Sequence, residues 1–137
     1  MRVEGRVIGE IGHGLLVFAG VEKGDAPNDI DYIAGKVNDL RIFDDPAGKM
    51  NLSLADTGGA VLVVSQFTLC GDCRRGRRPS FDDAEAPTAA RPLYEQLVAA
   101  LRALNADVAT GEFQAHMDVE LLNDGPVTIL LDSRRRW

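Results

Sequence analysis

Four aliphatic residues in a row, at positions 61–64, limit the folds open to this chain of 137 residues more than any other feature of its sequence. A continuous run of Val and Leu is typical of a strand buried in a sheet. Ser65, Gln66 and Thr68 follow directly, with Phe67 between them. We therefore predict a buried strand that ends by presenting hydroxyl and amide groups at the edge of its sheet.

The loop after this strand is rich in cations. Its arginines are Arg74, Arg75, Arg77 and Arg78. Polar groups at a strand end beside four guanidinium groups favour acyl-group chemistry next to a phosphate-binding patch, and hence a substrate with an anionic tail such as a nucleic acid. The alternative is an ordinary solvated loop, because runs of charge are common on protein surfaces. Three further arginines at 134–136 form a second positive cluster, although the net charge of −6 argues against a broad, non-specific nucleic-acid binder.

The length and composition are those of one globular domain, residues 1–137, with a core of its own. No apolar run approaches the ~20 residues of a membrane span, and the N-terminus lacks the apolar region of a signal peptide. We therefore expect a cytoplasmic protein that does not associate with membranes. Two cysteines without a secretion signal do not indicate a disulfide framework.

The remaining patterns predict strands and two helices. Asp25 is a suitable N-cap for the first helix, and Thr88 for the second, which admits Pro92 in its first turn. This order favours a single α+β domain with a mostly antiparallel, barrel-like sheet and two helices over a doubly wound parallel fold. The expected elements are an antiparallel pair of strands at 2–9 and 15–18, a helix at 26–40, a short strand at 41–43, a strand or ordered loop at 49–54, the central strand at 60–66, a helix after residue 88, and strands at 106–110, 116–122 and 127–132.

Cys70 and Cys73 form a C-x-x-C motif, which occurs in redox pairs and in zinc sites. A redox pair of the thioredoxin type opens a helix, whereas here an Arg-rich loop follows. A zinc site needs two more ligands, and the two histidines, His13 and His116, stand alone in the sequence. Two incidental thiols are the favoured interpretation.

The polar residues at the strand end allow three interpretations. A hydroxyl of Ser65 or Thr68 is a potential nucleophile, but the sequence places no base beside it. Backbone N–H groups at such a strand end can instead stabilise an oxyanion, with Gln66 orienting the substrate. The third interpretation is that these side chains only satisfy backbone groups at the edge of the sheet.

Four motifs stand in one order along the chain: Gly-Lys-Met-Asn-Leu-Ser at 48–53, Ser-Gln-Phe-Thr at 65–68, Gly-Arg-Arg-Pro-Ser-Phe at 76–81 and Asn-Asp-Gly-Pro-Val-Thr at 123–128. Together they closely resemble the D-aminoacyl-tRNA deacylase family over nearly the whole chain. The resemblance implies a homodimeric enzyme that hydrolyses the ester between a D-amino acid, or glycine mischarged on tRNA-Ala, and the 3′-terminal adenosine of tRNA.

The resemblance also implies roles for individual residues. Phe67 and Thr68 would supply backbone N–H groups to the scissile carbonyl, with the terminal 2′-hydroxyl of the RNA assisting water. An older view makes the Thr68 hydroxyl the nucleophile. A cis Gly125-Pro126 peptide would enter the active site of the partner subunit and exclude the side chain of an L-amino acid. The arginine loop would contact the acceptor end of tRNA, and no metal or cofactor is required. The substrate pocket would include Phe113, Ala115, Met117 and Asn123.

Two departures from the family pattern follow. The family normally begins with one more strand, carrying a Gln-Arg-Val stretch, so either the start is misplaced or a sheet edge is left uncovered here. Gln114 stands where relatives usually have glycine, so either a side chain intrudes on the pocket or the backbone differs locally. Alternative functions are a non-catalytic nucleic-acid-binding module on the same fold and a related editing deacylase with relaxed chirality.

Overall fold

The apolar run at 61–64 forms the middle of β6 (Ala60–Ser65), the central strand of the computed structural model, which describes residues 1–104 and 107–137. Val61 and Val63 have no exposed surface. The strand pairs in parallel on one side with β3 (Gly14–Ala19) and on the other with β7 (Val108–Thr110). Neighbours on both edges explain why a continuous aliphatic run is needed here.

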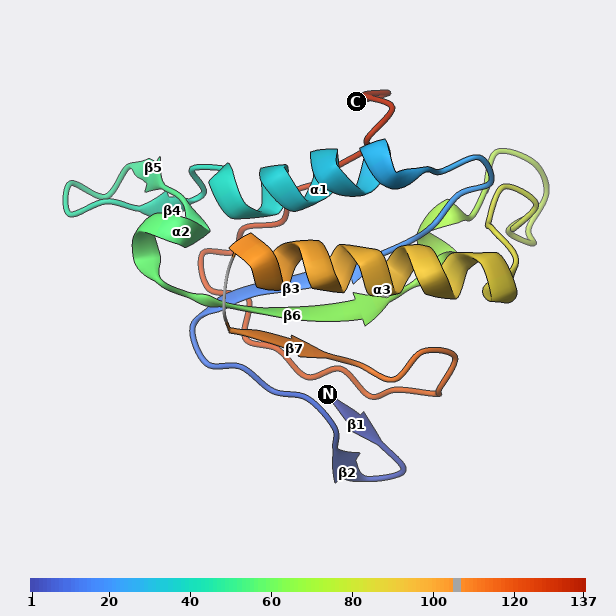
Figure 1. Cartoon of the computed structure of the whole chain (residues 1–137), viewed down its shortest axis with the longest axis horizontal. Coiled ribbons are helices and arrows are strands. Elements are labelled where there is room, and N and C mark those ends of the chain that lie inside the picture. Colours follow the sequence, from blue (N-terminus) through green and yellow to red (C-terminus); the bar gives the residue numbers. More distant parts are fainter. Residues whose placement is uncertain (105–106) are drawn as a thin grey trace.

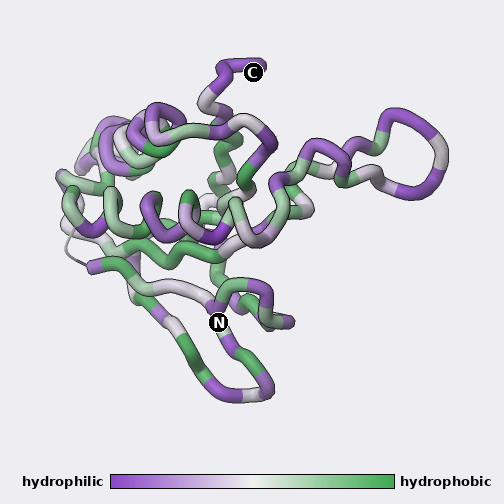
Figure 2. Tube along the Cα trace, turned by 45° about the vertical axis from the view of Figure 1, so that its right-hand side comes forward, coloured by the Kyte–Doolittle hydropathy of each residue, from purple (hydrophilic) through white to green (hydrophobic). Residues whose placement is uncertain are grey.

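Two long helices, α1 (Pro27–Asp39) and α3 (Pro87–Leu104), lie side by side over this sheet (Figure 1). Alternate residues of a strand point to opposite faces, so Val61 and Val63 face the helices. They form the larger hydrophobic cluster there with Leu97 and Leu101, among others. Figure 2 shows the hydrophobic colouring concentrated along the central strands and the hydrophilic colouring on the loops and outer faces. The core therefore holds β6 rigidly up to the point where its polar residues begin.

The other face of β6 carries a smaller cluster. Leu62 and Val64 pack there against Met1, with Met117 at its margin. The hairpin of β1 (Arg2–Val3) and β2 (Arg6–Val7) is joined to this region by a bridge between Arg2 and Asp118.

A small antiparallel pair, β4 (Phe43–Asp44) and β5 (Met50–Leu52), leads into the short helix α2 (Leu54–Thr57). Ser53 and Asp56 cap α2 reciprocally, with Ser53 N–H donating to Asp56 Oδ2 at 2.9 Å and Asp56 N–H to Ser53 Oγ at 3.1 Å. The motif at 48–53 is thus a turn, a strand and a helix cap. No helix in the described part of the chain is long and apolar enough to cross a membrane.

The structure confirms the α+β class and corrects several details of the sequence prediction. The main sheet is parallel, and β3 pairs with β6 rather than with the N-terminal hairpin. A buried apolar run reports burial but not strand direction, so the sequence did not distinguish the two pairings. A third helix, α2, was missed because it has only four residues.

The predicted strands at 116–122 and 127–132 were wrong. Their apolar alternation is real, but within residues 1–104 and 107–137 neither segment forms a strand: Asp118 makes only an isolated bridge to Arg2 of β1, and Leu122 is 93% exposed. The predicted strand at 106–110 is β7, with residue 106 outside the described residues. The predicted N-caps of the two long helices were also wrong. Ala26, not Asp25, is the N-cap of α1, and α3 begins at Pro87, one residue before the predicted cap Thr88.

Candidate functional site

The chain changes direction where β6 ends. Gln66 N–H still bonds to Ala19 O of β3 at 2.8 Å, and the next residues form the 3-10 helix η1 (Phe67–Cys70). Leu69 N–H donates back to Gln66 O at 3.2 Å. The first N–H groups of a helix have no partner within it, and those of Phe67 and Thr68 bond to no group in the described part of the chain. Two free backbone donors therefore follow directly on a rigid strand.

The side chains at this strand end are accessible. Phe67 is 57% exposed and Thr68 is exposed, whereas Ser65 and Gln66 are half-buried. The Gln66 amide donates to the Thr68 hydroxyl, which has no other side-chain partner among the described residues. An amide is not a base, so this geometry does not activate the Thr68 hydroxyl as a nucleophile.

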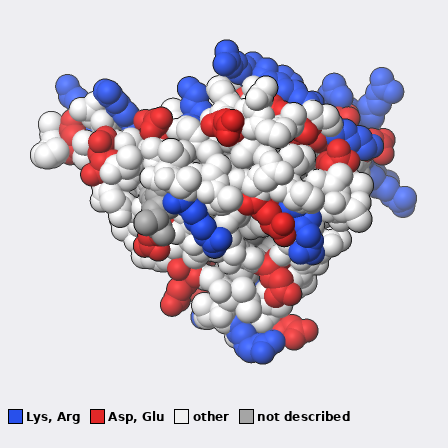
Figure 3. Space-filling view, viewed as in Figure 1, with Lys and Arg blue, Asp and Glu red and all other residues white. Residues whose placement is uncertain are grey.

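The arginine loop, residues 72–80, closes on itself through paired hydrogen bonds between the backbones of Asp72 and Ser80. Arg74 forms a two-point contact with the Asp72 carboxylate, and this hydrogen bonding lowers the pKa of Asp72 to about 2. Figure 3 shows Lys and Arg side chains projecting from the end of the molecule where this loop lies. The remaining arginines are exposed and form no ion pair with any described residue: Arg75, Arg77 and Arg78.

An aromatic contact joins the arginine loop to the strand end. The rings of Phe67 and Phe81 meet edge to face at a centroid distance of 5.1 Å. The structure therefore brings the predicted Ser-Gln-Phe-Thr motif and the predicted cationic loop together.

The second cluster of arginines, at 134–136, is not a free cationic patch. Arg134 and Arg136 each contact the Glu22 carboxylate at 2.8 Å, and Arg136 also pairs with Asp132. The hydrogen bond from Arg136 lowers the pKa of Asp132. Arg135 lies over the Tyr32 ring. These cations bind the C-terminal segment to the rest of the protein.

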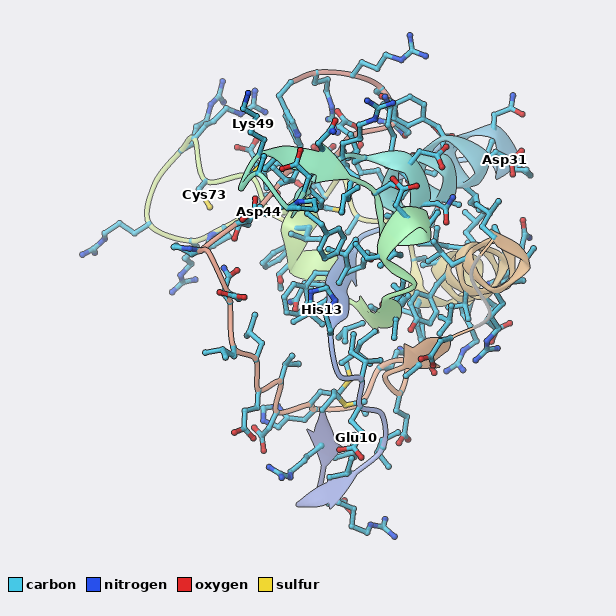
Figure 4. All side chains as sticks on the ribbon, turned by 90° about the vertical axis from the view of Figure 1, so that its left-hand side faces the viewer. Glu10, His13, Asp31, Asp44, Lys49 and Cys73 are labelled. Atoms are coloured by element: carbon cyan, nitrogen blue, oxygen red, sulfur yellow. The ribbon has the colours of Figure 1, made fainter. Side chains whose placement is uncertain are left out.

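The two cysteines are free thiols. Cys70 donates to Val21 O at 3.7 Å, and burial raises its pKa, which makes it a poor nucleophile. His13 packs against the Phe43 ring and lies well apart from Cys73 (Figure 4). No group of three or more metal-binding side chains occurs among residues 1–104 and 107–137.

The residues expected in the substrate pocket do not converge within one chain. Phe113 lies on the helix side, against Tyr94 and under the Arg91 guanidinium, and lines an open hollow of about 350 Å³ beside α3. Met117 packs at the opposite face of β6, and Ala115 donates its N–H to Glu112 O in the connecting turn. Asn123 lies farther along the chain, where its side chain accepts from Val127 N–H.

The loop at 123–128 is exposed, and its Gly125-Pro126 peptide is cis. In Figure 1 the segment coloured for these residues passes the end of the sheet where β6 begins, whereas η1 follows the end where β6 finishes. Within one chain, the loop at 123–128 therefore lies away from the Ser-Gln-Phe-Thr motif.

Gln114 has a left-handed backbone, with φ of 65°, and its side chain is exposed. This conformation is one that glycine adopts readily and other residues rarely adopt. Its side chain lies on the surface, next in the chain to Phe113.

Residues 1–132 match the model of the family described as D-Tyr-tRNA(Tyr) deacylase. The chain belongs to this family. A D-aminoacyl-tRNA deacylase of Thermosipho africanus is 57% identical over 98% of this chain and 91% of the relative. One of Symbiobacterium thermophilum is 58% identical over 98% and 89%.

Two solved structures superpose on this chain. A "c-Myc DNA Unwinding Element Binding Protein" superposes with a TM-score of 0.91 at 34% identity, over 96% of this chain and 89% of that one. A "probable eukaryotic D-amino acid tRNA deacylase" superposes with a TM-score of 0.64 at 19% identity, over 77% of each chain, and shows the shared fold.

Sequence reasoning missed the residues that support η1 from behind. Ala19, Val21 and Phe81 all contact the strand end or η1. Two of these contacts join positions more than 45 residues apart, and no local pattern marks them. The only signal was the aromatic residue that closes the Pro-Ser-Phe end of the arginine loop.

Proposed function

We propose that the chain, a hydrolase of the deacylase family, releases D-amino acids from D-aminoacyl-tRNA by stabilising an oxyanion with the backbone N–H groups of Phe67 and Thr68. Water attacks the ester carbonyl, the negative charge develops on its oxygen, and the bond to the ribose 3′-oxygen breaks. The terminal 2′-hydroxyl of the RNA assists the attacking water. Donors fixed in advance are effective because they need no reorganisation during the reaction.

The observation that carries this proposal is the pair of free N–H groups at the start of η1, directly beside a loop with three unpaired arginines. An oxyanion site requires donors that the fold leaves unbonded and accessible, and this strand end supplies them. The Thr68 hydroxyl, bonded to an amide, is not needed as a nucleophile.

The arginine loop is proposed to bind the acceptor end of tRNA through its phosphates. Arg75, Arg77 and Arg78 are available, whereas Arg74 is occupied by Asp72. The short distance between the loop and the strand end, joined through Phe67 and Phe81, suits a substrate whose reactive ester is attached to a polyanion.

Selection against L-amino acids is proposed to come from Gly125 and Pro126 of a second copy in a homodimer. The loop that carries them is exposed and lies at the other end of the sheet from the Ser-Gln-Phe-Thr motif, so only a partner chain can supply it. Because glycine has no side chain to exclude, glycyl-tRNA is also an expected substrate.

Incubation with D-tyrosyl-tRNA and L-tyrosyl-tRNA tests the proposal. Release of the D-amino acid alone is expected, and glycyl-tRNA mischarged on tRNA-Ala should also be hydrolysed. Equal release of both enantiomers would favour an editing deacylase with relaxed chirality. Sedimentation of the same sample should show a dimer.

A second candidate is a non-catalytic nucleic-acid-binding module. The superposition with a protein described as binding a DNA unwinding element favours it, as do the unpaired arginines. Binding of tRNA or DNA without release of the D-amino acid would support this candidate against the first.

A further inference from the structure

The last residue of β3 and the residues that follow it, positions 19–25, form a segment that we call the support loop. Its first residues lie against the back of η1. Besides the bond from Gln66 N–H to Ala19 O, the Cys70 thiol donates to Val21 O. A Cβ placed on Gly20 would lie 3.1 Å from the Gln66 carbonyl oxygen and 3.3 Å from Cys70 Sγ. These contacts are tighter than ordinary van der Waals contacts, so a side chain at position 20 would push on the strand end and η1.

The support loop also contacts residues 82–85, which follow the arginine loop. Val21 O accepts from Glu85 N–H at 2.9 Å, and Lys23 N–H donates to Asp83 O at 2.9 Å. The Lys23 ammonium donates to Asp82 O. The support loop therefore contacts both η1 and the residues that follow the arginine loop.

The outer side of the support loop is held by the C-terminal segment. The Glu22 carboxylate receives two guanidinium groups, those of Arg134 and Arg136, and its side chain is only 18% exposed. Arg134 also bonds to Asp25 Oδ1 at 3.0 Å and to Lys23 O at 2.8 Å. Glu22 is the residue on which both arginines converge.

We propose that Glu22 is a positioning residue for the deacylation, holding the support loop, and through it η1, in place by its contacts with Arg134 and Arg136. This inference rests on the proposed function of the N–H groups of η1. Its physical basis is that a partly desolvated carboxylate shared by two guanidinium groups is a stronger constraint than an exposed ion pair. Oxyanion donors are effective only at the correct distance, and a misplacement of about 1 Å can cost about 10²-fold in rate.

The test compares three full-length variants. Glu22→Gln keeps the shape and removes the charge, and Arg136→Gln removes one of its partners. Asp56→Asn is the matched control, because it weakens the cap of α2, at the opposite end of the fold from η1 (Figure 1). The first readout is kcat and KM on D-tyrosyl-tRNA, and the second is hydrogen exchange at Leu69 and Gly71, whose N–H groups hold η1 together.

For Glu22→Gln we expect kcat to fall about 10- to 100-fold with KM little changed, since positioning affects the transition state more than binding. Exchange at Leu69 and Gly71 should accelerate about 10-fold in both test variants and stay at the wild-type rate in the control. A wild-type protein that fails to release D-tyrosine would refute the proposed function. In that case hydrogen exchange at Leu69 and Gly71 would still test whether Glu22 holds η1 in place.

Three results would overturn the positioning role. The first is unchanged exchange at Leu69 and Gly71 in Glu22→Gln, whatever the activity. The second is a normal kcat for this variant beside an active wild type. The third is an equal loss of kcat in Asp56→Asn, which would show that any destabilisation has the same effect.

Discussion

Deleting a single backbone donor is the most direct test of the oxyanion site, and the structure offers a position where this can be done. Phe67 is the first residue of η1, and its N–H has no partner in the described part of the chain. Proline is tolerated at the first position of a helix, since the missing N–H would be unbonded there. The preceding residue, Gln66, already lies outside the α region, with φ of −143° and ψ of 81°, as a residue before proline should.

Phe67→Pro removes the donor and the aromatic ring together, whereas Phe67→Ala removes only the ring. The ring contact with Phe81 is worth about 0.5–1.5 kcal/mol, and both variants lose it. The ratio of their rates therefore isolates the N–H. Loss of one oxyanion donor typically lowers kcat by about 10²–10³-fold, or about 2.7–4 kcal/mol, and we expect Phe67→Pro to fall below Phe67→Ala by this factor.

The assay is single-turnover release of D-tyrosine from D-tyrosyl-tRNA with enzyme in excess, which separates chemistry from product release. Thermal unfolding of both variants serves as the control for folding, and their midpoints should agree within about 4 °C. If Phe67→Pro reacts within about fivefold of Phe67→Ala while remaining folded, the Phe67 N–H is not an oxyanion donor and the mechanism is wrong.

Four further predictions concern the site and its surroundings. Thr68→Ala should lose less than about tenfold in kcat, because its hydroxyl is bonded to an amide and not to a base; a loss of about 10⁴ or more in the same assay would establish the nucleophile mechanism. Arg77→Gln should raise KM for the tRNA substrate and reduce the slope of log KM against log salt concentration by about 1. Arg74→Gln should change this slope less, because Asp72 already neutralises the charge of Arg74. Gln114→Gly should raise the free energy of unfolding by up to about 1 kcal/mol, since it relieves a left-handed non-glycine backbone; denaturant unfolding measures this, and a destabilised variant would contradict the assignment. The pKa of Asp132 is lowered in the folded protein, so this carboxylate stabilises the fold at pH values above the ordinary carboxyl pKa, and the stabilisation is lost as the pH falls through the lowered pKa. Fluorescence of the single tryptophan, at position 137, should report release of the C-terminal segment in this acidic range. The Asp132→Asn variant should lack the transition.

Parts of this site were predictable because their signal is local. Four aliphatic residues in a row predicted the strand at 60–66, and Ser65, Gln66 and Thr68 predicted correctly where it ends. The unpaired state of three arginines was not predictable, since the same four-arginine pattern includes Arg74, which Asp72 neutralises. The cluster at 134–136 looked equally cationic in sequence, yet its side chains bind Glu22, Asp25 and Asp132.

The strands expected at 116–122 and 127–132 show the limit of periodicity. Their alternation of apolar and polar residues predicts a strand with one buried face, and Val119 and Leu131 do pack against the two clusters. A strand also needs continuous backbone pairing with a neighbour, and within the described residues these two segments have only the isolated bridge between Asp118 and Arg2. Exposed Leu122 and Leu130 lie along the segments that remain unpaired.

The sequence by itself determined the burial of β6, the two long amphipathic helices and the polar residues at the end of the strand, because each of these depends on residues close together in the chain. It also indicated the family, through four motifs that stand in one order between residues 48 and 128. Only the tertiary structure decided the parallel pairing of β3 with β6, the position of the support loop against η1, and the separation of the loop at 123–128 from η1. These features depend on contacts between residues tens of positions apart. Side-chain periodicity records whether a residue is buried, but not which distant segment buries it.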